Sequence, residues 1–371
     1  MGEIMEEMPV TTVVALAGFI AGIVFGATAN KSNFCTMGAL SDIVFMEDYS
    51  RFRAWLLAMA VAIIGSQALH IMGVVDLYES IYQTTNLGWL GAIIGGLMFG
   101  FGMTMAGGCA NKNLVRIGGG NLKSIIVVVV MGIFGYMTLR GLVGLARIEL
   151  EDFSNVDLSE MGLASQGMID IAAMAVGSEA ESLRLGFTAL FAGALLFYCF
   201  KDNDFRSQPL NILGGLIVGA MIPVGWWITG VLGADDFDPL PLFSFTFVSP
   251  AGESIQYLMT FTGATINFGI ATVGGIITGS FLMAMMSNSF HIEAFTDTDD
   301  MKRHLFGAAI MGIGGILALG CTVGQGITGM STLALGSLIA LISIIIGGLV
   351  GLKYMEEGSL GGALKALAGN Q

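Results

Sequence analysis

Long apolar runs alternate with short polar segments along most of the 371-residue chain. A helix needs about 20 mainly apolar residues to cross the hydrocarbon core of a bilayer. The pattern therefore predicts an all-α polytopic membrane protein with about nine transmembrane helices, in which the longest run is tilted or broken. The nine apolar runs have the approximate limits 10–29, 52–74, 88–108, 122–146, 184–200, 209–232, 257–286, 305–320 and 334–352.

Composition narrows the class of protein. Hydrophobic residues make up 54% of the chain and charged residues only 12%, about half of the charged fraction of a soluble domain. These values exclude a soluble enzyme, a disordered chain and a disulfide-stapled secreted domain. The net charge of −13 argues against nucleic acid as a partner, because phosphate would be repelled. Residues 1–8 are acidic and lack the basic start of a cleavable signal peptide.

The distribution of charge predicts an orientation. With nine crossings and the N-terminus outside, 12 of the 15 Lys and Arg residues fall in inside loops. Basic residues favour the cytoplasmic side of a membrane, so we expect an outside N-terminus and a cytoplasmic C-terminus. The acidic residues gather in two outside segments, 149–183 and 233–256, and the second contains Asp236 and Asp238.

An internal repeat is visible around two of the four cysteines. Residues 95–109 read GGLMFGFGMTMAGGC and residues 307–321 read GAAIMGIGGILALGC. Aligned on Cys109 and Cys321, glycine recurs at four positions and alanine at one. Five crossings separate the two motifs, so they must run in opposite directions through the bilayer. We expect inverted pseudo-repeats, an architecture common in secondary transporters, at 10–146 and 209–352; 147–208 would connect them through an acidic outer loop and one helix.

Three cysteines lie in breaks rich in glycine or polar residues: NKSNFCTMG (30–38), GGCANKN (107–113) and GCTVGQG (320–326). Backbone N–H groups in such breaks attract anions, and a thiol suits sulfur better than oxygen. The breaks therefore predict a path for a small anion that contains sulfur or a related soft element. The candidate substrate-binding residues are Cys35, Cys109, Cys321, Gly107, Gly108, Gly320, Thr322, Asn33, Asn111 and Gln325.

Simpler interpretations stay open. Buried cysteine often serves as a small hydrophobic residue, the interpretation we keep for Cys199, and glycines spaced four apart often mark helix packing in membranes. Arg116 and Lys123 could draw an anion inward or could simply be positive-inside anchors. No CxxC pair is present, so local spacing gives no support for a metal site or a reactive dithiol. We expect no cofactor and no catalytic residue, and a disulfide cannot be inferred.

Three stretches resemble the YeeE/YedE membrane proteins, which take up thiosulfate and related sulfur species. They are Phe34-Cys35-Thr36, GGCANKNLVRIGGGNLKS (107–124) and ALGCTVGQGITGMSTLALGS (318–337). The resemblance implies a bacterial inner-membrane importer with an hourglass-like body, nine crossings and re-entrant loops, in which Cys35, Cys109 and Cys321 contact the substrate. It also implies a small cytoplasmic sulfur-carrier protein of the TusA type as a partner, beside membrane lipid. Some relatives are linked to selenium.

The chain also departs from this pattern. The second-half counterpart of the Cys35 region is Val224-Gly225-Trp226-Trp227, which has no cysteine. The outer segments 149–183 and 233–256 have no equivalent within the repeat. They could form a lid or a docking surface, or they could be merely length.

Together these features predict thiosulfate uptake by a protein that is not an enzyme. The terminal sulfur would pass Cys321 on the outer side, then Cys109, then Cys35 on the inner side. Backbone N–H groups around Gly107, Gly108, Gly320 and Thr322 would bind the sulfonate oxygens. The alternatives are transport of a selenium compound or another sulfur species, and a membrane sulfurtransferase that works through a cysteine persulfide. No membrane-embedded carboxylate indicates a proton or sodium site, so no coupling ion is predicted.

Overall fold

The computed structural model describes residues 9–235 and 240–367. Residues 1–8, Asp236 and Asp238, whose acidity contributed to the predictions, lie outside this part. The described chain is almost entirely helical and confirms the all-α polytopic class. Its only two strands are β1 (Asn86–Leu87) and β2 (Val156–Asp157), which pair antiparallel.

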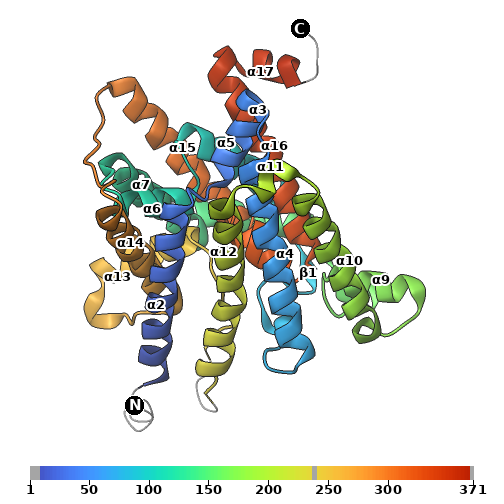
Figure 1. Cartoon of the computed structure of the whole chain (residues 1–371). Coiled ribbons are helices and arrows are strands. Elements are labelled where there is room, and N and C mark those ends of the chain that lie inside the picture. The colour runs from blue at the N-terminus through green and yellow to red at the C-terminus, as the bar shows by residue number, and fades with distance from the viewer. Residues whose placement is uncertain (1–8, 236–239, 368–371) are drawn as a thin grey trace.

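The helices follow one another closely along the chain (Figure 1). The first set is α2 (Val10–Lys31), α3 (Thr36–Met46), α4 (Ser50–Ile71), η1 (Leu77–Glu79), α5 (Trp89–Met105), α6 (Ala110–Gly118), α7 (Leu122–Arg140), α8 (Val143–Ser154), η2 (Leu158–Met161), α9 (Met168–Val176) and α10 (Ala180–Phe200). The second set is α11 (Asn203–Arg206), α12 (Pro209–Trp227), η3 (Ile228–Leu232), α13 (Val248–Met259), η4 (Phe261–Gly263), α14 (Phe268–Met286), α15 (Thr298–Leu317), η5 (Gly324–Gly329), α16 (Leu335–Glu357) and α17 (Leu360–Leu367).

Eight helical segments of the described chain are long and apolar enough to cross a membrane. The ninth expected crossing, 305–320, falls in α15, whose first turns carry Asp299, Asp300, Lys302 and Arg303. The 257–286 run does not form a single helix. Helix α13 ends at Met259 and α14 begins at Phe268, because the Asn267 side chain accepts the Ile270 N–H and caps a new helix there.

Glycine allows the helices to pack backbone against backbone. A Cβ on Gly26 of α2 would lie 2.2 Å from the carbonyl oxygen of Ile276 in α14. A Cβ on Gly100 of α5 would lie 2.1 Å from the carbonyl oxygen of Ile344 in α16. Small residues at such crossings are typical of helix association in membranes, where apolar contact with lipid gives no net driving force. Much of the glycine surplus therefore serves helix packing.

The same contacts give the directions of the helices. Helix α2 runs parallel to α14, since Gly18 contacts Phe268 and Gly26 contacts Ile276, and α4 likewise runs parallel to α12. Helix α5 runs antiparallel to α15, since Gly95 contacts Gly314 and Gly102 contacts Gly307. The two helices that carry the Gly-Cys motifs thus point in opposite directions.

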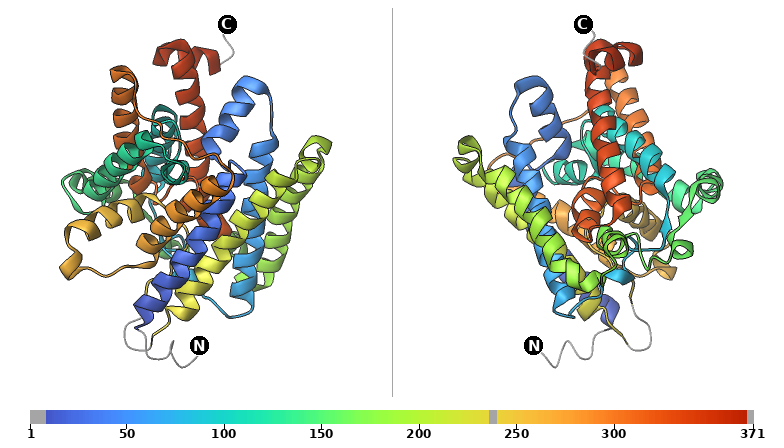
Figure 2. Two further views of the ribbon diagram at one scale, coloured as in Figure 1. Left: turned by 60° about the vertical axis from the view of Figure 1, so that its left-hand side comes forward. Right: turned by 90° about the vertical axis from the view of Figure 1, so that its right-hand side faces the viewer.

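The long helices pack in one continuous series (Figure 2). Helices α10, α4, α12 and α2 pack in that order, and α14, α13, α7, α15, α5 and α16 continue the body. Figure 1 shows α2 beginning at one end of the molecule, here called the lower face, and α17 lying at the opposite end, the upper face. Helix α5 ascends and α15 descends, so Cys109 follows the upper end of α5 and Cys321 follows the lower end of α15.

Candidate functional site

All three cysteine-bearing breaks share one backbone design. In each, the residue two positions before the cysteine has a left-handed conformation, with φ of 53° at Asn33, 70° at Gly107 and 57° at Leu319. The N–H of that residue bonds the carbonyl three residues back, and the next N–H bonds the carbonyl five residues back. This pair of bonds is the Schellman cap, which ends a helix and satisfies its last carbonyls. The chain therefore turns at the same point before each thiol.

The cap corrects one prediction. The N–H groups of Gly107, Gly108 and Gly320 already bond the carbonyls of Thr104, Met103 and Gly315. They are not available for sulfonate oxygens. Available donors instead follow each cysteine, because the first N–H groups of a helix have no partner within it. Two thiols accept such groups, Cys35 from Gly38 N–H and Cys321 from Gly324 N–H, both at 3.3 Å.

The breaks converge inside the protein. Cys35, Cys109 and Cys321 are 6%, 1% and 0% exposed, and all four cysteines are free thiols. The side chain of Cys109 interacts with that of Cys35 from the first break and with that of Thr322 from the opposite motif. Three segments far apart in sequence thus bring polar side chains together at the centre.

Positive charge surrounds the Cys35 and Cys109 end of this site. Lys112 of α6 donates to the Asn33 side chain, and Arg116, one turn later, donates to the Gly107 carbonyl at 2.6 Å. Among the described residues no carboxylate pairs with Lys112 or Arg116. Their charge is therefore available to an anion. Asn33 itself contacts Lys112 and does not reach the Cys321 break.

The Cys321 end is neutral. The Thr246 side chain lies against Gly324, and the Trp55 ring lies against Gly326. The Thr328 hydroxyl donates to the Phe245 carbonyl at 2.7 Å. Hydroxyl and indole groups therefore line the turn that follows this thiol.

Several buried polar atoms near the breaks have no hydrogen-bond partner: both amide atoms of Asn111, Thr322 Oγ1, Gln325 Oε1 and Trp55 Nε1. An unpaired buried polar group costs about 1–3 kcal/mol, so such groups commonly mark the place of a ligand or an ordered water. Three of the four residues were predicted from the sequence. Trp55 was missed, and its only signal was that it is the one tryptophan of the 52–74 run.

Gln325 lies apart from the other predicted site residues. Its Nε2 donates to the Ala318 carbonyl at the start of the break, and its Oε1 lies near Gly329. It also lines a cavity of about 30 Å³ near the lower end of α5, together with Tyr82 and Ser337. Gln325 therefore lies on the lower side of Cys321, away from Cys109.

The segment 149–183 contacts the second motif directly. Met168 N–H bonds the Leu333 carbonyl at 2.9 Å, and Leu335 N–H bonds the Gln166 carbonyl at 3.0 Å. We call residues 165–184 the strap. The strap is therefore more than a connection without a role, because it fixes the chain between η5 and α16.

A buried polar network holds the strap. Arg184 is 4% exposed and donates to Gln67 at 3.1 Å and to the Tyr78 hydroxyl at 2.8 Å. Burial raises the pKa of Tyr78 to about 12, so the hydroxyl stays protonated and donates to Asp170 at 2.9 Å. Gln67 in turn donates to the Ser331 carbonyl at 2.9 Å. No local pattern marks this network, because its members are far apart along the chain.

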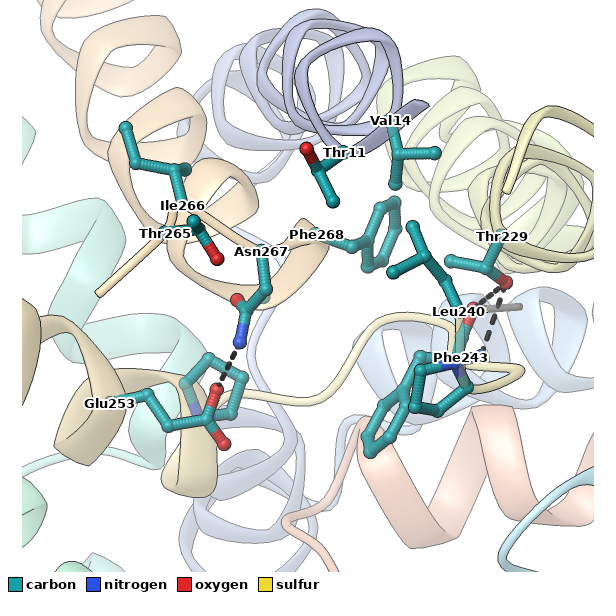
Figure 3. A pocket seen from close by; sticks show the side chains of 13 residues that line it. Thr11, Val14, Thr229, Leu240, Phe243, Glu253, Thr265, Ile266, Asn267 and Phe268 are labelled. Atoms are coloured by element: carbon teal, nitrogen blue, oxygen red, sulfur yellow. Dashed lines mark hydrogen bonds between the residues drawn. The ribbon is translucent and has the colours of Figure 1, made fainter. Parts of the chain in front are cut away.

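Figure 3 shows a cavity of about 170 Å³ near the lower end of α2, between the start of α14 and the 240–247 loop. None of the predicted site residues lines it. Its walls are mainly apolar, and its carboxylate, Glu253, accepts from Asn267 at 2.7 Å. A negative charge in an apolar pocket disfavours a dianion, so this cavity is not part of the anion site.

The fold and the site define a multi-pass membrane protein whose broken helices bring thiols and unpaired polar groups into its core. Residues 31–350 match the model of a family described as sulphur transport, and the chain belongs to that family. This match spans all three breaks and confirms the resemblance noted from the motifs.

Two relatives are named thiosulfate transporter TsuA. The one from Escherichia coli (strain K12) is 27% identical over 328 residues, which cover 84% of this chain and 86% of the relative. The one from Spirochaeta thermophila is 24% identical over 318 residues, which cover 85% of this chain and 91% of the relative. Both names describe transporters, in agreement with the prediction of a transporter over a membrane sulfurtransferase.

Proposed function

We propose that this protein takes up thiosulfate across the bacterial inner membrane and binds it between the Cys109 and Cys321 breaks. The observation that carries the proposal is the convergence of three capped breaks on a buried centre with unpaired polar atoms. Thiosulfate is a dianion with a soft terminal sulfur. Thiols match that sulfur, and amide, hydroxyl and indole donors match the sulfonate oxygens.

The direction of transport follows from charge. The lower face is the outside and the upper face is the cytoplasm, as the excess of Lys and Arg in the loops of the upper face indicates. The anion meets neutral groups at Cys321, then Cys109, and reaches Lys112 and Arg116 near Cys35. Weak successive contacts allow passage, because each must permit both entry and exit.

The facing Gly-Cys breaks are explained by two inverted pseudo-repeats. These repeats are residues 10–146 and 209–352, and residues 147–208 join them. The antiparallel course of α5 and α15 supports the division, as do the parallel pairs α2 with α14 and α4 with α12. Under the same relation α3 and α13 correspond, since each precedes the long helix of its pair. The counterpart of Cys35 is then Phe247, the residue before α13, in place of Val224–Trp227.

Uptake of radiolabelled thiosulfate tests the proposal, in a bacterial strain without its own importers. The wild-type chain should restore uptake, and Cys109→Ala and Cys321→Ala should each abolish it. The matched control is Cys199→Ala, because this buried thiol contacts the Arg53 carbonyl and none of the breaks. Normal uptake by both site variants, at wild-type expression, contradicts the cysteine path.

Two competing assignments have separate readouts. Unlabelled selenium compounds or other sulfur species should compete less well than thiosulfate; a stronger competitor would replace thiosulfate as the substrate. A stable added sulfur of about 32 Da on one cysteine would instead favour the sulfurtransferase.

The TusA-type carrier is tested by its co-purification with the full chain.

A further inference from the structure

A second cavity lies on the upper face, beside the Gly107 break. Its volume is about 210 Å³, and its charged and titratable walls are Arg116, Lys123, Glu293, Asp300, Arg303 and His304. One water needs only about 10–15 Å³ of such a volume. The cavity therefore accommodates a small oxyanion together with water.

Positive charge predominates in this cavity. Asp300 is paired with Arg303 at 2.6 Å and Lys123 at 3.3 Å, and its carboxylate lies 3.2 Å from His304 Nδ1. Glu293 is paired with Lys123 at 3.2 Å. Three permanent cations thus face two carboxylates. Arg116 is the cation that no described carboxylate neutralises.

The cavity shares a wall with the cysteine path. Arg116 Nη1 donates to the Gly107 carbonyl at 2.6 Å, and the described residues give the other N–H groups of the guanidinium no further hydrogen bond. His304 Nε2 lies 3.1 Å from the point where a Cβ on Gly107 would stand. Arg116 and His304 therefore lie between the cavity and the turn that precedes Cys109.

We propose that this cavity is a second anion site, which binds a tetrahedral oxyanion of the sulfate and thiosulfate class through the guanidinium of Arg116. A guanidinium offers paired donors that match two oxygens of such an anion. Sulfate lacks the soft terminal sulfur, so the site requires no thiol. Its role as the place where the transported anion is released rests on the proposed function; its affinity for an oxyanion does not.

Sulfate binding to the purified full-length chain, measured by calorimetry in detergent, tests the site. Wild type should bind sulfate saturably, and Arg116→Gln should weaken binding about tenfold or more, as expected when a charge-assisted contact is lost. Lys302→Gln is the matched control: it removes one positive charge near the start of α15, which also carries Asp300 and Arg303 of the cavity, but Lys302 is exposed and pairs with Asp299 outside the cavity. Arg116→Lys keeps the charge without the fork and should fall between wild type and Arg116→Gln.

The same assay separates this site from the cysteine path. A Cys109→Ala/Cys321→Ala double variant should bind sulfate as wild type does, even though its uptake of thiosulfate is lost. Unchanged sulfate binding by Arg116→Gln overturns the proposal, as does the absence of saturable binding by wild type. Loss of sulfate binding in the double cysteine variant also overturns it, because the anion would then lie at the thiols. Thermal unfolding without sulfate should verify that each variant is folded.

Discussion

The Gly107-Cys109 and Gly320-Cys321 breaks have the same backbone and different surroundings. Both follow a Schellman cap, and both place a left-handed residue two positions before the thiol. Around Cys109 lie Lys112, Arg116 and a buried histidine. Around Cys321 lie hydroxyl, amide and aromatic groups without a formal charge.

The backbone of the breaks and the charge around them therefore have different roles, which the repeated motif alone does not distinguish. The cap sets the position and direction of the thiol, and the neighbouring helices set the charge. Lys112 and Arg116 lie at the Cys109 and Cys35 end, so on the proposed path a dianion would gain electrostatic stabilisation as it moves from Cys321 toward Cys35. A fully symmetric site would lack this gradient.

The largest expected effect lies outside both breaks, in the network that fixes the neutral one. Arg184→Met removes the cation that bonds Gln67 and the Tyr78 hydroxyl, and so breaks the hydrogen-bonded chain that continues from Tyr78 to Asp170. Breaking such a buried network costs about 3–5 kcal/mol. The midpoint of thermal unfolding in detergent should fall markedly. Lys302→Gln, at an exposed pair, should leave it unchanged; an equal loss in both variants would contradict a specific role for the strap.

Charge at the other break should affect transport more than stability. Lys112→Gln removes a cation beside Cys35 and Cys109 while keeping a polar side chain. Losing a charge-assisted hydrogen bond costs about 1.5–3 kcal/mol, so the apparent affinity in uptake assays should fall about ten- to a hundredfold. Wild-type affinity in this variant would show that the cationic end does not act on the substrate.

Backbone strain at the left-handed residue also differs between the two breaks, and its expected effect on stability is smaller. Gly107→Ala places a side chain at a left-handed position and 3.1 Å from His304, which should cost about 1–2 kcal/mol of stability. Leu319→Gly makes the converse change at the equivalent position and should stabilise by at most about 1 kcal/mol. Opposite shifts in the unfolding midpoint are expected. Shifts of the same sign would mean that the two caps are not equivalent.

The smallest effect is expected at the neutral break. Thr322→Val removes an unpaired hydroxyl at nearly constant volume. A neutral hydrogen bond contributes about 0.5–1.5 kcal/mol, so the apparent affinity for thiosulfate should weaken about two- to tenfold. The unfolding midpoint should change little, because the hydroxyl forms no hydrogen bond in the protein beyond its contact with the weakly polar Cys109 thiol. A loss as large as that of Lys112→Gln would contradict the contrast between the two ends.

Periodicity and motifs predicted most of the architecture but not the chemistry of the caps. The apolar runs gave the helical class, and the repeated Gly-Cys pattern gave the opposed α5 and α15. The sequence could not show that the N–H groups of Gly107, Gly108 and Gly320 are consumed by their own helices. Leu319 hides the third cap, because left-handed backbone is expected of glycine or asparagine.

Long-range contacts explain the other omissions. Trp55 reaches Gly326 from more than two hundred residues away along the chain, and the strap joins Gln166 to Leu335. Neither contact leaves a local pattern. The 257–286 run was expected to be tilted or broken, and it is broken, but its apolar character gives no sign that the break lies at the Asn267 cap.

The central claim is that the two Gly-Cys breaks jointly bind the transported anion. A structure of the full-length protein determined by electron cryo-microscopy with thiosulfate tests it most directly. The account predicts density for the anion between Cys109 and Cys321, with its oxygens near Asn111 and Thr322. Density confined to the upper-face cavity or to the apolar cavity of Figure 3, with none between the breaks, would contradict it.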